Sequence, residues 1–275
     1  MVVLSLDTKK DPYRPKRDDE MVLASELPYL SVIGALLYLA QCTRPDIAFS
    51  VNLLTRYSSA PTSQHWTGIK HILRYLRATT DMGLFYSSES TNAPSIVGYA
   101  DVGYLSDPHQ GCSQTGYVFA CGGTVISWRS AKQTLVAISF NHSKILALHE
   151  ASHECVWLRL VIHHIRSACA LPSATDTPTI LNEDNIACIA HITGGYIKDD
   201  KTKHISPKFL YTHEPQKSQE IKVRQIRSSN NLADLFTKSL PKCTFQKLVH
   251  GIGLRQLCKQ SNWSMQNLEE HSRVL

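Results

Sequence analysis

Residues 139–166 read SFNHSKILALHEASHECVWLRLVIHHIR, the longest stretch of the chain with a helical pattern and no Gly or Pro. Apolar or small side chains recur along it at the three- and four-residue spacing of a helix that packs on a core. They are Ile145, Leu148, Ala151, Cys155, Leu158, Ile162 and Ile165. Ser139 or Asn141 can cap the start of this helix. The pattern therefore predicts one long helix with a single buried face.

Lys144 does not fit this pattern. It lies four residues before Leu148 and so extends the buried face by one turn towards the N-terminus. In the first turn a cation is also opposed by the helix dipole. Two interpretations stay open: the side chain can extend out of the turn into water, or it can occupy a position built for another residue.

The composition indicates a folded protein inside the cell. A hydrophobic content of 43% in 275 residues is enough for a core, and a net charge of +6 permits a polyanionic partner without requiring one. The eight cysteines form no CxxC pair, which favours reduced thiols over a disulfide framework. No signal peptide follows Met1, and the longest apolar run is too short to cross a bilayer. We expect an intracellular protein, cytoplasmic or nuclear, without membrane attachment.

A polar, serine-rich link at residues 88–94 divides the chain. The predicted parts are a linker at 1–27, a helical part at 28–87, an α/β part at 95–257 and a loose tail at 258–275. Within the helical part, helical patterns cover residues 28–41, 47–57 and 64–77. The third has an exposed basic face with Lys70, His71, Arg74 and Arg77. That face is either a solvated surface or a track for a phosphate backbone.

Beyond the link, strand patterns alternate with helical ones. Strands are predicted at 96–104, 115–120, 124–128, 177–182 and 220–226. Helices are predicted at 139–166, 185–192, 207–213, 230–239 and 243–254. This order predicts an α/β fold with a mixed sheet and flanking helices.

Three aspartates lie where packing alone does not explain them. Asp101 falls inside an apolar strand, where a buried carboxylate must pair, protonate or hold a metal. Asp184 follows a strand and precedes a helix, so it is either a ligand or a helix N-cap. Asp234, in NLADLFTK, is either a ligand or a cap-like or first-turn residue of a helix. If the three converge, their hard oxygen ligands favour Mg²⁺ or Mn²⁺ and a two-metal clamp on a phosphodiester.

The sequence resembles the C-terminal part of copia-type retrotransposon Pol polyproteins, the end of the reverse transcriptase followed by RNase H. The resemblance covers about residues 5–257, nearly the whole chain. It is carried by LSVIGALLYLAQCTRPDIAFSVNLLTRYSSAP, HWTGIKHILRYLRATTDMGLFY, GYADVGYLSD, SQTGYVFACGGTVISWRSAKQTLVA, LHEASHECVWLR, EDNIACIA, KTKHI and NLADLFTKSLP. It implies an RNase H-like fold after a small helical segment like a polymerase thumb or connection. The catalytic palm of the polymerase would precede Met1, so no DNA synthesis is expected.

The resemblance also implies a catalytic site. The family cleaves the RNA strand of RNA–DNA hybrids with an Asp-Glu-Asp-Asp set around two Mg²⁺ ions. Matched by motif, the aspartates are Asp101, Asp184 and Asp234, and the position of the glutamate holds Lys144. Since an ammonium repels metal ions, we expect Lys144 to pair with Asp101 or Asp184 and the nuclease to be weak or inactive.

Two other functions remain possible. The first is a non-catalytic nucleic-acid-binding module that uses Lys70, Arg74, Arg77 and the basic loop with Lys203 and His204. In the resemblance, His204 matches a histidine with a structural or substrate-facing role. The second is a non-functional relic of a retroelement. A hybrid-cleavage assay separates an enzyme from both.

Overall fold

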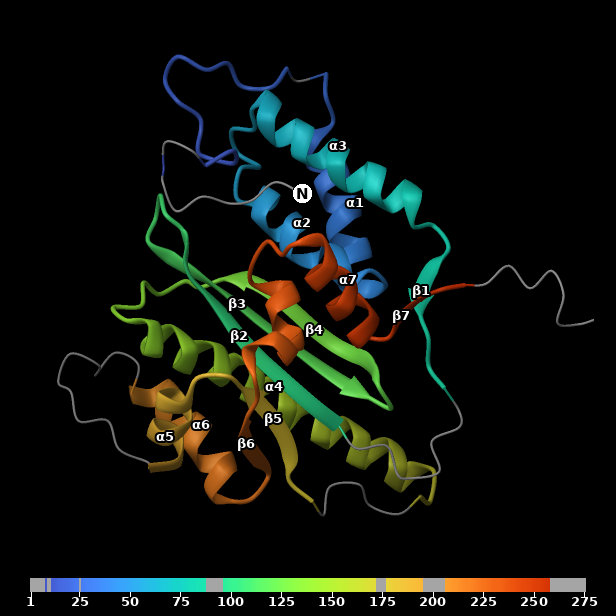
Figure 1. Ribbon diagram of the computed structural model, residues 1–275, viewed down its shortest axis with the longest axis vertical. Coiled ribbons are helices and arrows are strands. Elements are labelled where there is room, and N and C mark those ends of the chain that lie inside the picture. Colours follow the sequence, from blue (N-terminus) through green and yellow to red (C-terminus); the bar gives the residue numbers. More distant parts are fainter. Residues whose placement is uncertain are drawn as a thin grey trace, which may run out of the picture.

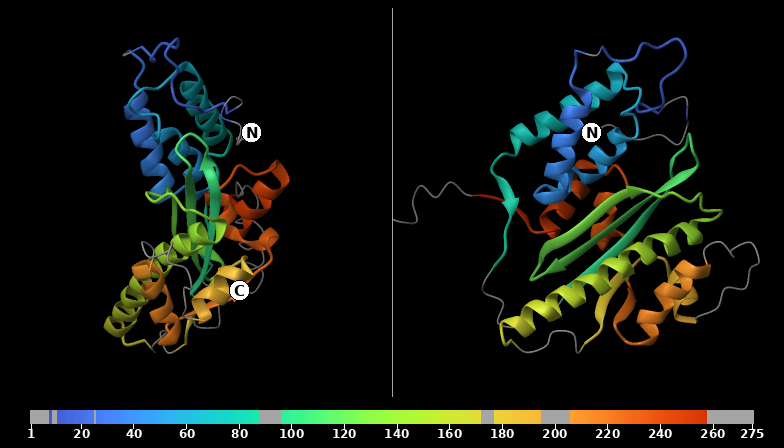
Figure 2. Two further views of the ribbon diagram at one scale, coloured as in Figure 1. Left: turned by 90° about the vertical axis from the view of Figure 1, so that its left-hand side faces the viewer. Right: turned by 180° about the vertical axis from the view of Figure 1, so that it is seen from behind.

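The computed structural model describes residues 8, 11–24, 26–87, 96–171, 177–194 and 206–257. A five-stranded sheet lies at its centre, with a long helix across one face (Figure 1). Helices near the C-terminus lie on the other face, and the N-terminal helices stand beside the edge of the sheet formed by residues 124–132, as Figure 2 also shows. No helix in the described ranges is both long and apolar enough to cross a membrane.

The sheet has the strand order β4-β3-β2-β5-β6. Its strands are β2 (Ile96–Asp107), β3 (Cys112–Cys121), β4 (Thr124–Lys132), β5 (Thr179–Glu183) and β6 (Ile221–Gln225). The first three are antiparallel neighbours in a meander, whereas β5 and β6 run parallel to β2. Parallel neighbours need crossover connections, and helices supply them here. The mixed α/β sheet predicted from the sequence is confirmed.

The long helix α4 (Phe140–Ala168) begins where the sequence predicts. Ser139 is its N-cap, because its hydroxyl accepts a hydrogen bond from the backbone N–H of His142 at 3.2 Å. The buried face predicted for this helix holds as far as Leu158. Beyond that point the prediction was wrong for Ile165, whose side chain is 52% exposed because the last turns of α4 extend past the buried cluster, which ends at Leu158.

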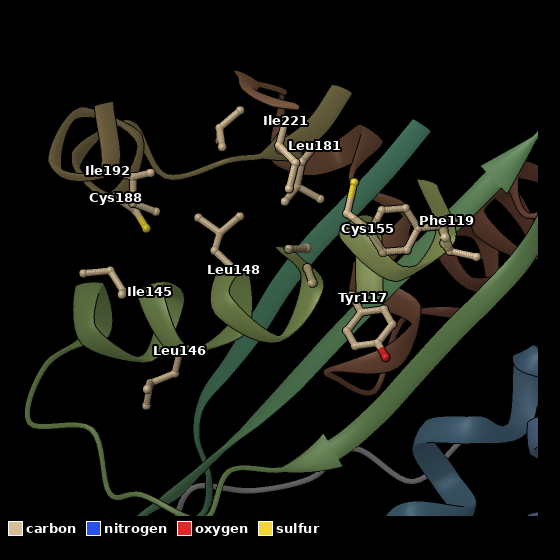
Figure 3. Close-up of a cluster of buried hydrophobic side chains, with 14 of the residues drawn as sticks. Tyr117, Phe119, Ile145, Leu146, Leu148, Cys155, Leu181, Cys188, Ile192 and Ile221 are labelled. Atoms are coloured by element: carbon tan, nitrogen blue, oxygen red, sulfur yellow. The ribbon is translucent and has the colours of Figure 1, made fainter. Parts of the chain in front are cut away.

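The core between α4 and the sheet joins elements that are far apart in sequence. Leu148 and Cys155 of α4 pack with Leu181 of β5 and Phe119 of β3 (Figure 3). The helices α5 (Ile186–Gly194) and α6 (Ser206–Lys217) pack beside α4 over the parallel strands. Burial of such side chains stabilises each by about 1.5–3 kcal/mol, so this core fixes the first turn of α4 above β2 and β5.

The opposite face of the sheet is covered by the C-terminal segment. It contains the short 3₁₀ helices η3 (Ser228–Asn230) and η4 (Leu232–Phe236), the helix α7 (Lys242–Gly251) and the strand β7 (Leu254–Gln256). Phe236 and Leu248 from this segment pack on Val118 and Val125. The α-helix predicted at 230–239 was wrong. Asn231, which caps η4, and the turn at Thr237 and Lys238 confine the helical conformation to single 3₁₀ turns.

The N-terminal helices form a third cluster of buried side chains. They are α1 (Tyr29–Cys42), the 3₁₀ turn η1 (Pro45–Ile47), α2 (Ala48–Thr55) and α3 (Ser63–Ala78), followed by strand β1 (Met82–Leu84). The indole Nε1 of Trp128 donates to the carbonyl of Ala40 at 2.7 Å, and Gln114 Nε2 donates to Asn52 Oδ1 at 2.9 Å. Because β1 also pairs with β7, the helical part is held to both the sheet and the C-terminal segment.

Candidate active site

Four carboxyl groups meet at the end of the parallel strands. Asp101 lies on β2, Glu183 ends β5 and Asp184 follows it, while Asp234 comes from η4 on the other face of the sheet. Tyr99 pairs with Asn182, so the parallel register continued by two residues brings Asp101 level with Asp184. The fold therefore brings the three predicted aspartates together and adds Glu183, which the sequence interpretation missed.

Lys144 lies at the centre of this cluster. Its Nζ lies 2.7 Å from Oδ1 of Asp101 and 2.5 Å from Oδ1 of Asp184. It also lies 2.9 Å from Oε1 of Glu183. The side chain is 1% exposed, so the interpretation in which it reaches into water was wrong. The pairing predicted for Lys144 is confirmed, and it is wider than expected, because three carboxyl groups surround its three N–H donors.

Lys238 is a second cation at the cluster. Its Nζ lies 2.9 Å from Oδ1 of Asp234 and 3.3 Å from Oδ2 of Asp101. The hydroxyl of Thr237 donates to the same Oδ2 at 2.5 Å. Unlike Lys144, Lys238 has a side chain that is 41% exposed. The sequence carries a signal for the pair, because Lys238 lies four residues after Asp234.

Two glycines let the segment with Asp234 and Lys238 approach the sheet. A Cβ on Gly103 would lie 2.4 Å from the carbonyl oxygen of Thr237, and a Cβ on Gly116 would lie 2.8 Å from Cβ of Phe236. Contacts that short require the backbone to shift. The absence of side chains at these two positions thus places Thr237 and its neighbours directly beside Asp101.

Neighbouring asparagines, not the aspartates, cap the adjacent helices. The Oδ1 of Asn185 accepts from the backbone N–H of Cys188 at 2.9 Å at the start of α5. The Oδ1 of Asn231 accepts from the backbone N–H of Ala233 at 3.1 Å at the start of η4. The interpretation of Asp184 as an N-cap was therefore wrong. Asp234 lies in the first turn of η4, as one interpretation of the sequence expected, and both carboxyl groups are available to the cluster.

Burial and the two lysines shift the acid pKa values in different directions. Burial opposes ionisation of Asp101, but the charges of Lys144 and Lys238 outweigh it and hold its pKa below the usual range. The pKa of Asp184 is also lowered, since its contacts with Lys144 outweigh partial burial. Burial raises the pKa of Glu183 to about 8 despite Lys144.

The remaining groups complete the charge distribution. Burial, together with the nearby charge of Asp101, raises the pKa of Asp234 to about 7. Burial disfavours the charged form of Lys144, but Asp101 and Glu183 raise its pKa overall. At neutral pH two ammonium groups therefore face two firmly ionised carboxylates, Asp101 and Asp184, and two carboxyl groups that titrate near neutrality.

These residues do not fit a divalent metal ion as they stand. The position between Asp101, Asp184 and Glu183, where carboxyl groups would stabilise a bound cation most, is occupied by Nζ of Lys144. Within the described ranges, no group of three or more His, Cys, Asp or Glu side chains could hold a metal ion. The metal-binding and catalytic roles of Asp101, Asp184 and Asp234 stay predictions.

The residues predicted to bind nucleic acid lie apart from this cluster in sequence and in element. Lys70, Arg74 and Arg77 are exposed on α3, which packs mainly on α1 and α2. Their role stays a prediction. Lys203 and His204 lie outside the described residues.

The chain is similar to several known proteins, although no protein-family model matches it. It is 30% identical over 240 residues to the Retrovirus-related Pol polyprotein from transposon TNT 1-94 of Nicotiana tabacum, which is 87% of this chain and 17% of that protein. For the polyprotein from transposon RE2 of Arabidopsis thaliana the identity is 29% over 226 residues, covering 82% of this chain and 15% of that protein.

Two further similarities cover a smaller part of the chain. Secreted RxLR effector protein 161 of Plasmopara viticola is 42% identical over 132 residues, which is 48% of this chain and 92% of that protein. The crystal structure of LC11-RNase H1 in complex with an RNA/DNA hybrid aligns with a TM-score of 0.38 and 17% identity, over 52% of this chain and 94% of that one. A TM-score this low leaves the fold to be judged from the strand order itself.

The antiparallel β2–β4 meander, extended by parallel β5 and β6 and crossed by α4, defines an RNase H-like α/β domain with acidic residues on β2 and after β5. The chain belongs to the copia-type, retrovirus-related Pol polyproteins of transposons. It spans about one sixth of the length of the two Pol polyproteins described above.

Proposed function

We propose that this part of a Pol polyprotein has the nucleic-acid-binding surface of an RNase H but an impaired phosphodiester-cleaving site. The supporting observation is the position of Lys144 Nζ, within 2.9 Å of three carboxyl groups. Divalent ions held by such carboxylates supply the activated water and the charge neutralisation in this class of nuclease. Here the ammonium holds the carboxylates instead, and it cannot bind or activate a water nucleophile as a metal does.

The positive charge of Lys144 opposes the binding of a divalent metal ion at this site. At an effective dielectric of 20, a divalent ion 4 Å from an ammonium is opposed by about 8 kcal/mol, twice the value for unit charges. Lys144 cannot escape this repulsion by swinging into water, because its side chain is 1% exposed and packed under the first turn of α4. Lys238, with 41% exposure, can move out. Lys144 is therefore the group that blocks the site.

The test is cleavage of a labelled RNA–DNA hybrid in Mg²⁺ or Mn²⁺. The wild-type chain should cleave weakly or not at all, and Lys144→Glu should raise the metal-dependent rate by at least tenfold. Adding Asp101→Asn to Lys144→Glu should abolish the gain. Lys144→Met, which removes the ammonium but supplies no carboxylate, is the matched control and should stay inactive.

Two results would contradict impairment. One is robust cleavage by the wild-type chain that Asp101→Asn abolishes. The other is a well-folded Lys144→Glu variant that gains no activity. Folding of that variant is checked by thermal unfolding with and without Mg²⁺, since its five clustered carboxyl groups should make its stability depend on a divalent ion.

A non-catalytic nucleic-acid-binding module is the second candidate. The exposed Lys70, Arg74 and Arg77 on α3 favour it, because a row of cations can follow a phosphate backbone. Binding to the hybrid in EDTA, with an affinity that falls steeply with salt, would support this module. Charge reversal of the three should remove most of that binding.

We also propose that residues 28–87 and 95–257 are the polymerase-derived and RNase H-like parts of the chain. The cluster of α1–α3 side chains and the core beneath α4 support this division. The free cysteines of the described ranges, three of them buried, support an intracellular location, cytoplasmic or nuclear.

A further inference from the structure

A cavity of about 760 Å³ lies between the N-terminal helices and the C-terminal segment. Its walls come from α2, α3, η4, α7 and β7, and most of the wall is apolar. Ile47, Phe49, Ile72, Val249 and Leu254 line it and are buried. The size lies within the range of about 300–1,000 Å³ that is typical of small-molecule sites, which are also mainly apolar.

The charged groups around this cavity are almost all basic. Lys238, Lys242 and Arg255 line it, together with His71 and His250. Within the described residues, neither Lys242 nor Arg255 forms an ion pair with an acidic side chain.

Asp46 is the one carboxylate among the described residues that line the cavity, and its charge is already compensated. Its oxygens accept from Arg44 Nε at 2.9 Å and Nη2 at 2.7 Å, and from the hydroxyl of Tyr75 at 2.6 Å. A ligand would therefore meet an apolar interior and an uncompensated positive rim. Neutral or cationic apolar molecules would suit the apolar interior but would not compensate the positive charge at the rim.

We infer that this cavity binds a small amphipathic anion, an apolar chain that ends in a single carboxylate. The chain would lie against Phe49 and Val249. The carboxylate would lie at the basic rim, which Lys242 lines at the start of α7 and Arg255 lines beyond its end. This inference does not depend on the cleavage proposal, because none of these four residues belongs to the carboxyl cluster.

Thermal unfolding and calorimetric titration of the full chain test the inference, with dodecanoate below its micelle concentration as the probe. Dodecanoate should raise Tm and bind at one site. Dodecanol should bind more weakly, and the dodecyltrimethylammonium cation should not bind. The double variant Lys242→Glu/Arg255→Glu should weaken dodecanoate at least tenfold and leave dodecanol unchanged. Lys222→Glu, at an exposed position of β6 away from the cavity lining, is the matched control and should leave dodecanoate binding unchanged.

Variants that fill the cavity with a large side chain test the inference without changing the charge at its rim. Ser50 on α2 and Gln246 on α7 are exposed residues that line the cavity from two different helices, so Ser50→Trp or Gln246→Trp should fill the cavity without disturbing the core. Either one that unfolds like the wild type should lose dodecanoate binding. Equal binding of the anion and the cation, or unchanged binding in both blocking variants, would overturn the inference. So would binding that occurs only after residues 258–275 are removed, since the chain itself would then fill the cavity.

Discussion

Lys144 and Lys238 hold the two oxygens of the same aspartate, Asp101, but in opposite surroundings. Lys144 rises from the first turn of α4 and is sealed under it, with three carboxyl groups around its ammonium. Lys238 follows η4 on the other face of the sheet and keeps 41% of its side chain in contact with solvent. A fully buried cation becomes part of the core, whereas water can take the place of a partly exposed one. The difference in burial, rather than in the number of contacts, makes Lys144 a structural group and Lys238 a group that solvent can replace.

The largest effect should follow removal of the sealed charge. Lys144→Met keeps much of the side-chain volume but leaves the buried Asp101 and the partly buried Asp184 beside each other without the cation between them. Breaking a buried ion pair in this way costs about 3–5 kcal/mol. Urea unfolding of the variant and the wild type at pH 7 measures the difference. A loss under about 1 kcal/mol would mean that the carboxyl groups gain protons or water at little cost, and that the sealed site is not structural.

An effect of similar size should appear in the pH dependence of stability through Glu183. Its pKa is raised from 4.5 to about 8 in the folded chain, so the folded state holds this proton more tightly than the unfolded state. The resulting stability is complete below about pH 4.5 and is lost as the pH rises towards 8. At about 1.4 kcal/mol per pKa unit, the loss between pH 5 and pH 9 should be roughly 4 kcal/mol.

Glu183→Gln provides the control for that titration, because glutamine is similar in shape and has no proton to lose. Urea unfolding between pH 5 and pH 9 should show a flatter profile for the variant than for the wild type. Parallel profiles would mean that Lys144 keeps Glu183 ionised throughout this range and that its ammonium compensates three full negative charges.

The surroundings of the buried Lys144 can be predicted from the sequence better than those of the partly exposed Lys238. The helical period of residues 139–166 identifies Lys144 as a residue on the buried face, because the same period places Leu148 and Ala151 in the core. Its contact with Glu183 was not predicted. Strand alternation contains the signal, since Leu181 and Glu183 lie on one face of β5 and are both buried. A charged residue at a strand end was too weak a signal without its tertiary partner.

The region around Lys238 was harder to predict. Local sequence favours an α-helix through residues 230–239, but the segment packs on Gly103 and Gly116 and adopts short 3₁₀ turns instead. Tertiary packing thus overrides helix propensity here. The spacing of Asp234 and Lys238 survives the change, whereas the approach of Lys238 to Asp101 depends on those two glycines, which no local pattern reveals.

The smallest effect should come from the exposed cation. Lys238→Met should lower the free energy of unfolding by at most about 1 kcal/mol, because a partly exposed ion pair is screened by water and its loss lets solvent reach Asp234. Urea unfolding beside Lys144→Met gives the comparison directly, and 0.5 M salt should reduce the effect of Lys238→Met but not that of Lys144→Met. An equal decrease in the free energy of unfolding in the two variants would show that Lys238 contributes as much to stability as Lys144.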